Sequence, residues 1–371
     1  MNEQPRTGSA PRSRRDVLRT AGLAGLGLAG LPAVLTACGD GSATDAAATA
    51  SSTSTAAPAK LKVALGWIPN VEFAGYWIAQ SKGYYAAENL TVDFMPGGGS
   101  APDPTVSVSG GVADLGIHPA MASVVQAVTK GNDFVMIGAQ YQSSPGGLVS
   151  LASDPVKTPQ DLVGAKILGQ QGTQAGIEAV LQLAGLPKKF SFIPVGFDPS
   201  PLVRKRGKAY TCFVTNQPIT LEETFHLQPG KDYEVVTYAE LGLPSYADVV
   251  FCKRSLVRSR SDVLQRFMRA TVKGWQDNAK DPSVAAKLAV TEYGVDLGLD
   301  LKQQVRQNVL QIPLTQSALT RSKGLFRIDE SLLGGEMYDA MRASGTKELP
   351  DVAKIVDHSV LDAVYRGKAA I

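Results

Sequence analysis

Residues 60–85 read KLKVALGWIPNVEFAGYWIAQSKGYY, and this stretch sets the pattern that the rest of the chain repeats. Lys60–Leu65 is alternating and apolar enough to predict a strand. Phe73–Tyr85 follows with apolar residues at helical spacing, and Gly83 marks the helix end. The stretch therefore predicts a strand that leads through a short loop, 66–70, into a helix.

The same alternation of strands and helices continues in two runs. The first run is expected to contain the strands Leu90–Phe94, Ala113–Ile117 and Phe134–Gln140 and the helices Pro102–Ser109 and Met121–Thr129. The second begins near Asp154, with expected strands at Ala165–Leu168, Phe190–Val195, Ala209–Val214, Tyr233–Thr237 and Asp248–Cys252, expected helices at Gln174–Gly185 and Pro218–Thr224, and then helices at 261–280, 282–293, 300–311 and 329–343. Such alternation through short loops is typical of a largely parallel sheet with helices on both faces.

This pattern predicts an α/β protein with two lobes and a helical C-terminal segment. The first lobe is expected over residues 60–150 and the second over 151–247, and residues 248–371 return to the first lobe. We expect the chain to cross between the lobes near 148–152 and again near 246–252. In open α/β sheets, ligands bind beyond the carboxyl ends of the strands, so the residues just after each strand are the candidates for a site.

The N-terminal region is typical of an export signal. Arg14 and Arg15 precede an apolar run, Ala21–Leu35, which is too short for a membrane span of roughly 20 residues. The paired arginines resemble a twin-arginine signal, although Val17 departs from that pattern, and the export route stays open. Leu35-Thr36-Ala37-Cys38 resembles a bacterial lipobox, which implies cleavage after residue 37 and lipidation of Cys38. The alternative is an ordinary signal peptide in which Cys38 is incidental.

Composition narrows the class of protein further. Residues 38–59 are mostly Gly, Ser, Thr, Ala and Asp, which is typical of a flexible tether. The 371 residues are 44% hydrophobic and 19% charged, with a net charge of +3, so a globular body is expected and nucleic acid is not a partner. Three cysteines exclude a disulfide scaffold. Cys212 and Cys252 are interpreted as buried free thiols, with a disulfide between them as the alternative.

Several short blocks, taken in order, resemble a known family. They are GWIPN (66–70), FAGY (73–76), KGYY (82–85), PGGG (96–99), GGVADLG (110–116) and TPQDLVG (158–164). Their order and spacing resemble the NMT1/THI5-like family over roughly residues 60–290. The resemblance implies a periplasmic-binding-protein-like fold of type II, a monomer that passes a small molecule to the permease and ATPase of an ABC transporter, and attachment to the outer face of the membrane through Cys38.

Within that family, the sequence resembles some members more than others. Trp67-x-Pro69-Asn70 with Phe73-Ala74-Gly75 resembles the binders of thiamine pyrimidine precursors and riboflavin. Residues 213–218, FVTNQP, are similar to a segment of riboflavin-binding members. A sulfonate binder is the alternative, for which Arg204 and Arg206 are the nearest cations. The family's superfamily also contains thiamine-pyrimidine synthases, whose lysine follows the strand that contains Ala-Asp-x-Gly. Here Ile117-His118-Pro119 stands there, so a binding protein is expected rather than an enzyme.

The residues after the predicted strands of the first lobe suit a flat heteroaromatic ligand, which needs stacking faces and hydrogen-bond partners along its edge. Trp67 and Phe73 offer rings for stacking, with core packing as the alternative. Asn70 offers an amide that both donates and accepts, with a turn role as the alternative. His118 and Tyr141 follow two further strands, and a structural role for His118 is equally open.

The second lobe supplies the remaining candidates for ligand contact. Gln171 and Thr173 open a helix whose backbone N–H groups would receive a polar group of the ligand. The set is completed by Phe213, Thr215, Asn216 and Tyr246. No catalytic residue, cofactor or metal is assigned. The expected mechanism is closure of the two lobes over the ligand, followed by docking on a permease.

Overall fold

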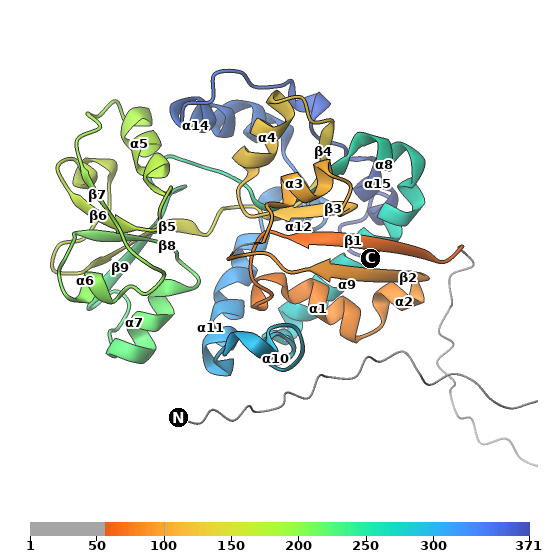
Figure 1. The fold of residues 1–371 in the computed structure, drawn as a ribbon, viewed down its shortest axis with the longest axis horizontal. Helices are drawn as coiled ribbons and strands as arrows, with labels where there is room; N and C mark the ends of the chain where they lie inside the picture. Colours follow the sequence, from red (N-terminus) through yellow and green to blue (C-terminus); the bar gives the residue numbers. More distant parts are fainter. Residues whose placement is uncertain (1–55, 100) are drawn as a thin grey trace, which may run out of the picture. The chain divides into compact units, whose positions relative to one another are not determined.

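The computed structural model describes residues 56–99 and 101–371. The predicted signal, Cys38 and most of the predicted tether lie outside those residues. Figure 1 shows two sheets, each with its own helices, as the sequence predicts for an α/β protein with two lobes. In the part of the chain that the structure describes, no helix is both long and apolar enough to cross a bilayer.

The first lobe is built on a five-stranded sheet in the order β2-β1-β3-β10-β4. Its strands are β1 (Ala59–Leu65), β2 (Leu90–Met95), β3 (Leu115–His118), β4 (Phe134–Tyr141) and β10 (Ala247–Lys253). β1 pairs in parallel with β2 and β3, whereas β10 runs antiparallel to both β3 and β4. The carboxyl ends of β1 to β4 therefore meet at one edge of the sheet.

The second lobe repeats this topology with a sheet in the order β7-β6-β8-β5-β9. Its strands are β5 (Gly146–Leu151), β6 (Lys166–Gly169), β7 (Ser191–Pro194), β8 (Ala209–Phe213) and β9 (Tyr233–Thr237). β5 is the antiparallel strand here, between β8 and β9. Each lobe thus receives its antiparallel strand directly after a crossing from the other lobe.

The crossings lie a few residues earlier than the sequence pattern suggests. β4 ends at Tyr141 and β5 begins at Gly146, so the first crossing is 142–145 and not 148–152. Residues 146–151 belong to the second sheet, and the second crossing is 238–246, before β10. A strand that opens with two glycines carries a weak sequence signal because glycine has no side chain to pack.

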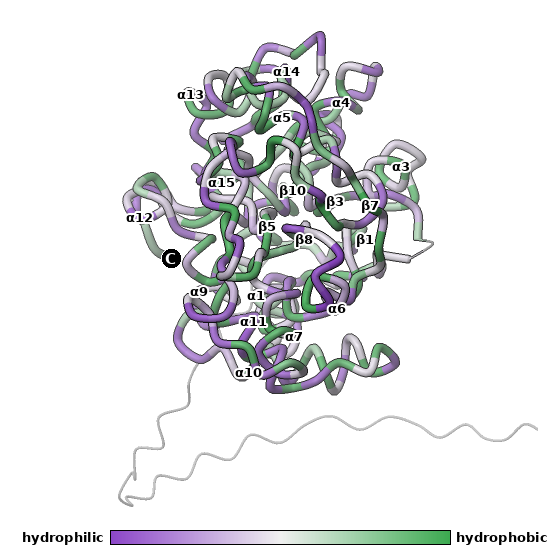
Figure 2. The backbone as a smooth tube through the Cα atoms, turned by 90° about the vertical axis from the view of Figure 1, so that its left-hand side faces the viewer, coloured by the Kyte–Doolittle hydropathy of each residue, from purple (hydrophilic) through white to green (hydrophobic). Residues whose placement is uncertain are grey.

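Helices cover both faces of each sheet. Around the first sheet lie α1 (Ala74–Ser81), α2 (Tyr84–Ala87), α3 (Pro104–Ser109), α4 (Met121–Thr129), α8 (Arg254–Ser259), α9 (Ser261–Lys280), α10 (Pro282–Leu288), α11 (Leu301–Gln311), α12 (Ala318–Lys323), α13 (Glu330–Leu332), α14 (Tyr338–Ala343) and α15 (Ser359–Tyr365). Around the second lie α5 (Gln174–Leu183), α6 (Ser200–Val203) and α7 (Gln217–Phe225). In Figure 2 hydrophobic and hydrophilic residues alternate along these helices, as amphipathic helices require.

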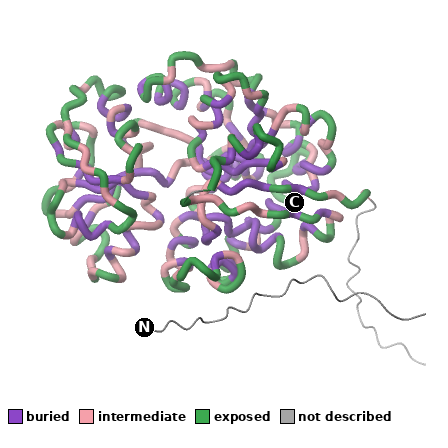
Figure 3. Tube along the Cα trace, viewed as in Figure 1, coloured by how far each residue is buried: buried purple, intermediate pink, exposed green. Residues whose placement is uncertain are grey.

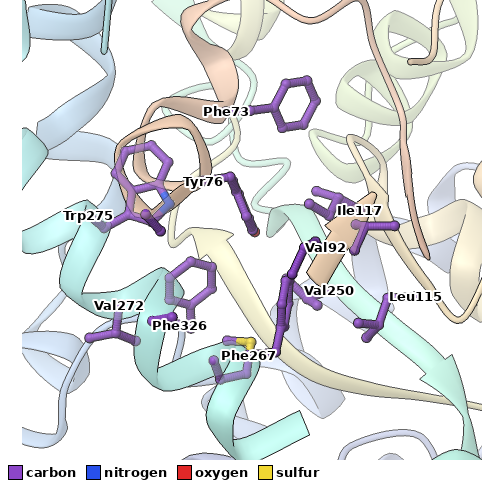
Figure 4. Packing of buried hydrophobic residues seen from close by; sticks show 14 of the residues in the cluster. Phe73, Tyr76, Val92, Leu115, Ile117, Val250, Phe267, Val272, Trp275 and Phe326 are labelled. Atoms are coloured by element: carbon purple, nitrogen blue, oxygen red, sulfur yellow. The ribbon is translucent and has the colours of Figure 1, made fainter. Parts of the chain in front are cut away.

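Buried residues concentrate on the strands and on the helix faces that cover them (Figure 3). β10 shows the alternation of a central strand: Val249 and Phe251 pack under α4 and α14, whereas Val250 and Cys252 pack under α1 and α9. On the face of the first sheet that α1 and α9 cover, Phe73, Tyr76 and Phe267 form an aromatic cluster (Figure 4). These cores fix the strand ends on which the candidate site is built.

Cys212 and Cys252 are free and buried, and they lie in different sheets, on β8 and β10. This confirms the interpretation of buried free thiols and excludes the disulfide between them.

Candidate functional site

The carboxyl ends of the parallel strands of both lobes are directed toward the crossings. β4 and β9 each run straight into a crossing segment, so the edge at which each strand ends is the edge nearest the other lobe. The lobes touch through α14 against α5 and α11 against α7. Arg306 on α11 lies 3.6 Å from Glu222 on α7, which is an ion pair between the lobes. The predicted site residues therefore belong to facing edges.

Trp67 contacts an aromatic ring of the other lobe. It follows β1 and is partly buried, and its ring meets that of Phe197 edge to face at a centroid distance of 5.4 Å. Phe197 follows β7 and is 59% exposed, which is unusual for a phenylalanine. The sequence analysis missed Phe197, although it stands two residues after an expected strand. The two rings give the facing edges an aromatic element from each lobe.

Gly66 explains how the loop after β1 reaches its neighbour. A Cβ atom at this position would lie 2.2 Å from Cδ of Pro119 and 2.8 Å from the carbonyl oxygen of Ile117. Only glycine allows the ends of β1 and β3 to approach this closely. Trp67 is thereby held beside the segment that follows β3.

Asn70 acts as a helix cap and is 2% exposed. Its amide oxygen accepts from the backbone N–H of Glu72 at 2.9 Å, and its carbonyl oxygen accepts from the indole N–H of Trp77 at 2.7 Å. The next residue, Val71, donates its N–H to Gln304 on α11. These contacts match the turn role that was the alternative to ligand contact for Asn70, because the side chain holds the loop that carries Trp67.

His118 has partners on both ring nitrogens. Its Nδ1 accepts from the backbone N–H of Ala120 at 2.9 Å, which leaves the proton of a neutral ring on Nε2, 3.0 Å from Asp103 Oδ2. The hydrogen bond from His118 holds the pKa of Asp103 well below its usual range. These contacts match the structural role left open for His118, and Asp103, a residue not predicted, is its partner.

Three predicted aromatic residues lie inside the protein. Phe73 is fully buried and packs against Tyr76 and Trp77, with ring centroids 6.3 and 5.8 Å away. Tyr141 donates its hydroxyl to Gln311 at 2.6 Å. Tyr246 accepts the backbone N–H of Asp329 at 2.8 Å. For Phe73, the structure shows the core packing named as the alternative to ligand contact.

The second lobe presents a set of linked polar groups at its edge. Thr173 donates to the carbonyl oxygen of Gln170 at 2.9 Å and lies 3.0 Å from the hydroxyl of Thr211. Gln170 in turn donates to the hydroxyl of Tyr210 at 2.7 Å. Gln171 is exposed in the turn between β6 and α5. This edge therefore combines amide and hydroxyl groups without an ion pair among these residues.

The segment after β8 reaches across to α11. Asn216 donates its amide to Gln307 at 3.1 Å, which is a hydrogen bond between the lobes. Phe213 is partly exposed, whereas Thr215 is buried. Among the predicted residues, Trp67 and Asn216 thus take part in direct contacts between the lobes.

A row of buried amides on α11 was also missed. Gln304, Gln307, Asn308 and Gln311 are all buried. Gln304 accepts from Val71 and Gln311 donates to the carbonyl oxygen of Val71, while Gln307 accepts from Asn216. The helical spacing of these amides was visible in the sequence, but amides on one helix face are ordinarily read as facing solvent. They join the loop after β1 to the second lobe.

Two α/β lobes of the same topology, joined by two crossings and facing each other with their strand ends, define a periplasmic-binding-protein-like fold. Solved structures share it. The ligand-binding component of an ABC-type import system from Staphylococcus aureus is 12% identical, with a TM-score of 0.59 over 83% of this chain and 99% of that one. The periplasmic aliphatic sulphonate-binding protein SsuA from Escherichia coli is 14% identical, with a TM-score of 0.58 over 80% and 92%.

The chain belongs to the NMT1/THI5 like family, which matches residues 70–285 and confirms the predicted resemblance. Its relatives include a formylaminopyrimidine-binding protein from Halalkalibacterium halodurans, 24% identical over 81% of this chain and 90% of that one. The riboflavin-binding protein RibY from Chloroflexus aurantiacus is 26% identical over 80% and 86%. A 4-amino-5-hydroxymethyl-2-methylpyrimidine phosphate synthase from Legionella pneumophila is 24% identical over 73% and 82%. The relatives of this chain thus include both binding proteins and a synthase.

Proposed function

We propose that this protein is the extracytoplasmic solute-binding component of an ABC importer, and that it captures a small planar heterocycle between its lobes. The observation that carries the proposal is the aromatic pair of Trp67 and Phe197, one ring from each facing edge. The two rings touch each other in this structure, so a flat ring enters only when the lobes move apart, and it would then gain a stacking face from each lobe. The importer's permease and ATPase are the proposed partners.

The polar groups around this pair suit a neutral ligand edge. Gln170, Thr173 and Asn216 offer amides and hydroxyls that match the donors and acceptors of a pyrimidine or flavin. Cations at the contact between the lobes already have partners, since Arg306 and Lys302 lie near Glu222 and Glu223. These features favour a riboflavin-like or pyrimidine-precursor ligand over a sulfonate. Two of the relatives are named for binding riboflavin and formylaminopyrimidine.

Arg204 and Arg206, the cations considered for a sulfonate, do not change this preference. Both are exposed, and Arg204, which follows α6, donates to the hydroxyl of Ser200 at the start of that helix. A sulfonate would need a fork of donors directed at the ligand.

The synthase among the relatives raises an enzyme as the second candidate. A synthase of this family would need a lysine after Ala113-Asp114-Leu115-Gly116, where this chain has Ile117 and then His118, the last residue of β3, with both ring nitrogens engaged. We therefore place the activity in binding and transport.

The proposal is tested by titrating riboflavin into the purified protein that begins after residue 38 and following flavin fluorescence, with hydroxymethylpyrimidine as competitor. Saturable quenching assigns a flavin ligand. A thermal shift with the pyrimidine and no quenching assigns a thiamine precursor. No response to either would contradict the ligand class while leaving the fold unchanged.

Export and anchoring are proposed from the sequence signals alone. If Cys38 is lipidated, the wild-type protein fractionates with membranes and a Cys38→Ser variant is released into the soluble extracellular fraction. Equal membrane association of both proteins would contradict the anchor.

A further inference from the structure

Two carboxyl groups meet in the interior of the first lobe. Glu72 lies in the short 3₁₀ helix η1 (Val71–Phe73) and is 3% exposed, and Asp248 is the second residue of β10 and is 0% exposed. Among residues 56–99 and 101–371, neither forms a salt bridge. Two buried acids without a cation cannot both be ionised at low cost, because each charge is desolvated and repels the other.

The hydrogen bonds around the pair leave one oxygen of each carboxyl group without a donor. Gln140 Nε2 donates to Asp248 Oδ2 at 2.8 Å and to the carbonyl oxygen of Glu72 at 3.0 Å. In the described part of the chain, Glu72 Oε1 and Asp248 Oδ1 are buried and receive no donor from another group. A proton held between the two carboxyl groups supplies the missing donor.

The electrostatics agree with this geometry. Burial raises the pKa of Asp248 to about 7, and the hydrogen bond with Glu72 lowers it in part. Burial, then repulsion by Asp248 and the shared hydrogen bond, raise the pKa of Glu72 well above its usual range. The two carboxyl groups therefore titrate as one coupled pair, and the last proton is shared between them.

The pair stands where three structural elements meet. Glu72 stands five residues beyond Trp67 and donates its backbone N–H to the capping side chain of Asn70. Gln140 lies at the end of β4, just before the first crossing, and Asp248 lies just after the second. Asp248 also has a φ of +47°, which a residue other than glycine adopts only where its surroundings fix it.

We propose that Glu72, Gln140 and Asp248 form a proton-dependent latch that positions the Trp67–Asn70 loop against the two strands that enter and leave the crossings. The latch acts as a set of positioning residues, and its effect on affinity rests on the proposed function of that loop in ligand binding.

Other titratable groups that face the pair stay neutral over the relevant range. Tyr76 on α1 and Tyr141 on β4 lie near it, and burial raises the pKa of both hydroxyl groups well above their usual range. Tyr85 lies behind Tyr76, and its pKa is raised as well. The group that titrates between about pH 6 and about pH 9 is therefore the carboxyl pair.

The sign of the pH effect follows from the raised pKa values. The folded latch binds its proton more tightly than the unfolded chain does, so its stabilising contribution is complete below the ordinary carboxyl range and is lost as the pH rises through about 7. Ionisation of Asp248 places one charge in this buried site, and loss of the remaining proton at higher pH places a second charge beside it. The loop that carries Trp67 then moves, and ligand affinity falls.

The test is a riboflavin titration between about pH 6 and about pH 9 on the wild type and on Glu72→Gln. The wild-type Kd should rise, by up to about tenfold for each pH unit above the apparent pKa of the pair. Glu72→Gln replaces the shared proton with a permanent N–H donor, so it should bind as the wild type does at the acidic end and show a flat profile. An equal pH dependence in both proteins would overturn the proposal.

A matched control and a ligand-free measurement separate the latch from the ligand assignment. Asp277→Asn also replaces a carboxylate by its amide, on α9, and its Kd should vary with pH as that of the wild type does. A Kd that does not vary with pH in this variant would overturn the specific role of Glu72. Infrared spectra of the wild type should show a protonated carboxyl band at about pH 6 that weakens toward about pH 9 as Asp248 ionises. If that band is absent at the acidic end, the latch is refuted whatever riboflavin does. If the band titrates but riboflavin does not bind, the proposed ligand fails and the shared proton stands.

Discussion

Removing the ring of Phe197 should weaken ligand binding strongly while leaving the fold almost unchanged. Phe197 is 59% exposed, so Phe197→Ala removes little buried surface, and the free energy of unfolding should change by less than about 0.5 kcal/mol. A stacking contact with a flat ring contributes about 1–3 kcal/mol. Because about 1.4 kcal/mol corresponds to a tenfold change, the Kd should rise by about 5-fold to about 150-fold.

The assay is quenching of riboflavin fluorescence, with thermal unfolding measured on the same samples. Val112→Ala is the matched control because Val112 is 54% exposed and precedes β3, away from the carboxyl ends of the strands. Its Kd should equal that of the wild type. If Phe197→Ala and Val112→Ala bind riboflavin equally well, while the wild type binds it, the aromatic pair does not hold the ligand.

Three further predictions concern stability and reactivity. Gly274→Ala should destabilise the protein by about 1–3 kcal/mol or more, seen as a lower Tm, because a Cβ atom there would lie 1.9 Å from the carbonyl oxygen of Gly75 where α9 crosses α1; an unchanged Tm would contradict this packing. Burial alone would raise the pKa of Asp277, but hydrogen bonds from Lys280, Lys82 and Tyr84 outweigh it and hold the pKa well below its usual range. The carboxylate therefore stabilises the fold, by under about 1 kcal/mol for a surface pair, above the ordinary carboxyl range, and this stabilisation is lost as the pH falls. Asp277→Asn should lower the Tm at neutral pH, and the difference in Tm from the wild type should shrink in acid. Burial raises the pKa of Cys252 to about 12 and that of Cys212 well above its usual range, so a thiol reagent should label neither until the protein unfolds, and rapid labelling of the native protein would show that the thiols are accessible.

The positions of most helices and strands could be predicted because they depend on the spacing of apolar residues over short stretches of sequence. The spacing of apolar residues located α9 at 261–280 to the residue, and the helix expected at 300–311 is α11, Leu301–Gln311. β5 was missed because its opening glycines weaken the strand pattern, and its place in the second sheet is decided by pairing with β8 and β9. Pairing between strands distant in sequence leaves no local signal.

The candidate site was predicted less completely, for a different physical reason. The strand-end rule located Trp67, His118 and Asn216 but not what their side chains bond to. Whether a polar residue near a strand end contacts a ligand or holds a loop depends on partners far along the chain, as Gln304 does for Val71. The pair of Glu72 and Asp248 could not be predicted for the same reason, because the two residues are 176 positions apart in the sequence.

The two lobes share a topology but offer different edges. On the first lobe, the side chains of Asn70, His118 and Tyr141 are already hydrogen-bonded within the lobe, so this edge is fixed before any ligand arrives. On the second lobe, Gln171 and Phe197 are exposed and have room to rearrange. A rigid edge lowers the entropic cost of binding, whereas exposed side chains adapt when the lobes close. Apart from Trp67, substitutions in the first lobe should therefore act on affinity through the shape of the loop after β1, and those in the second through direct contact with the ligand.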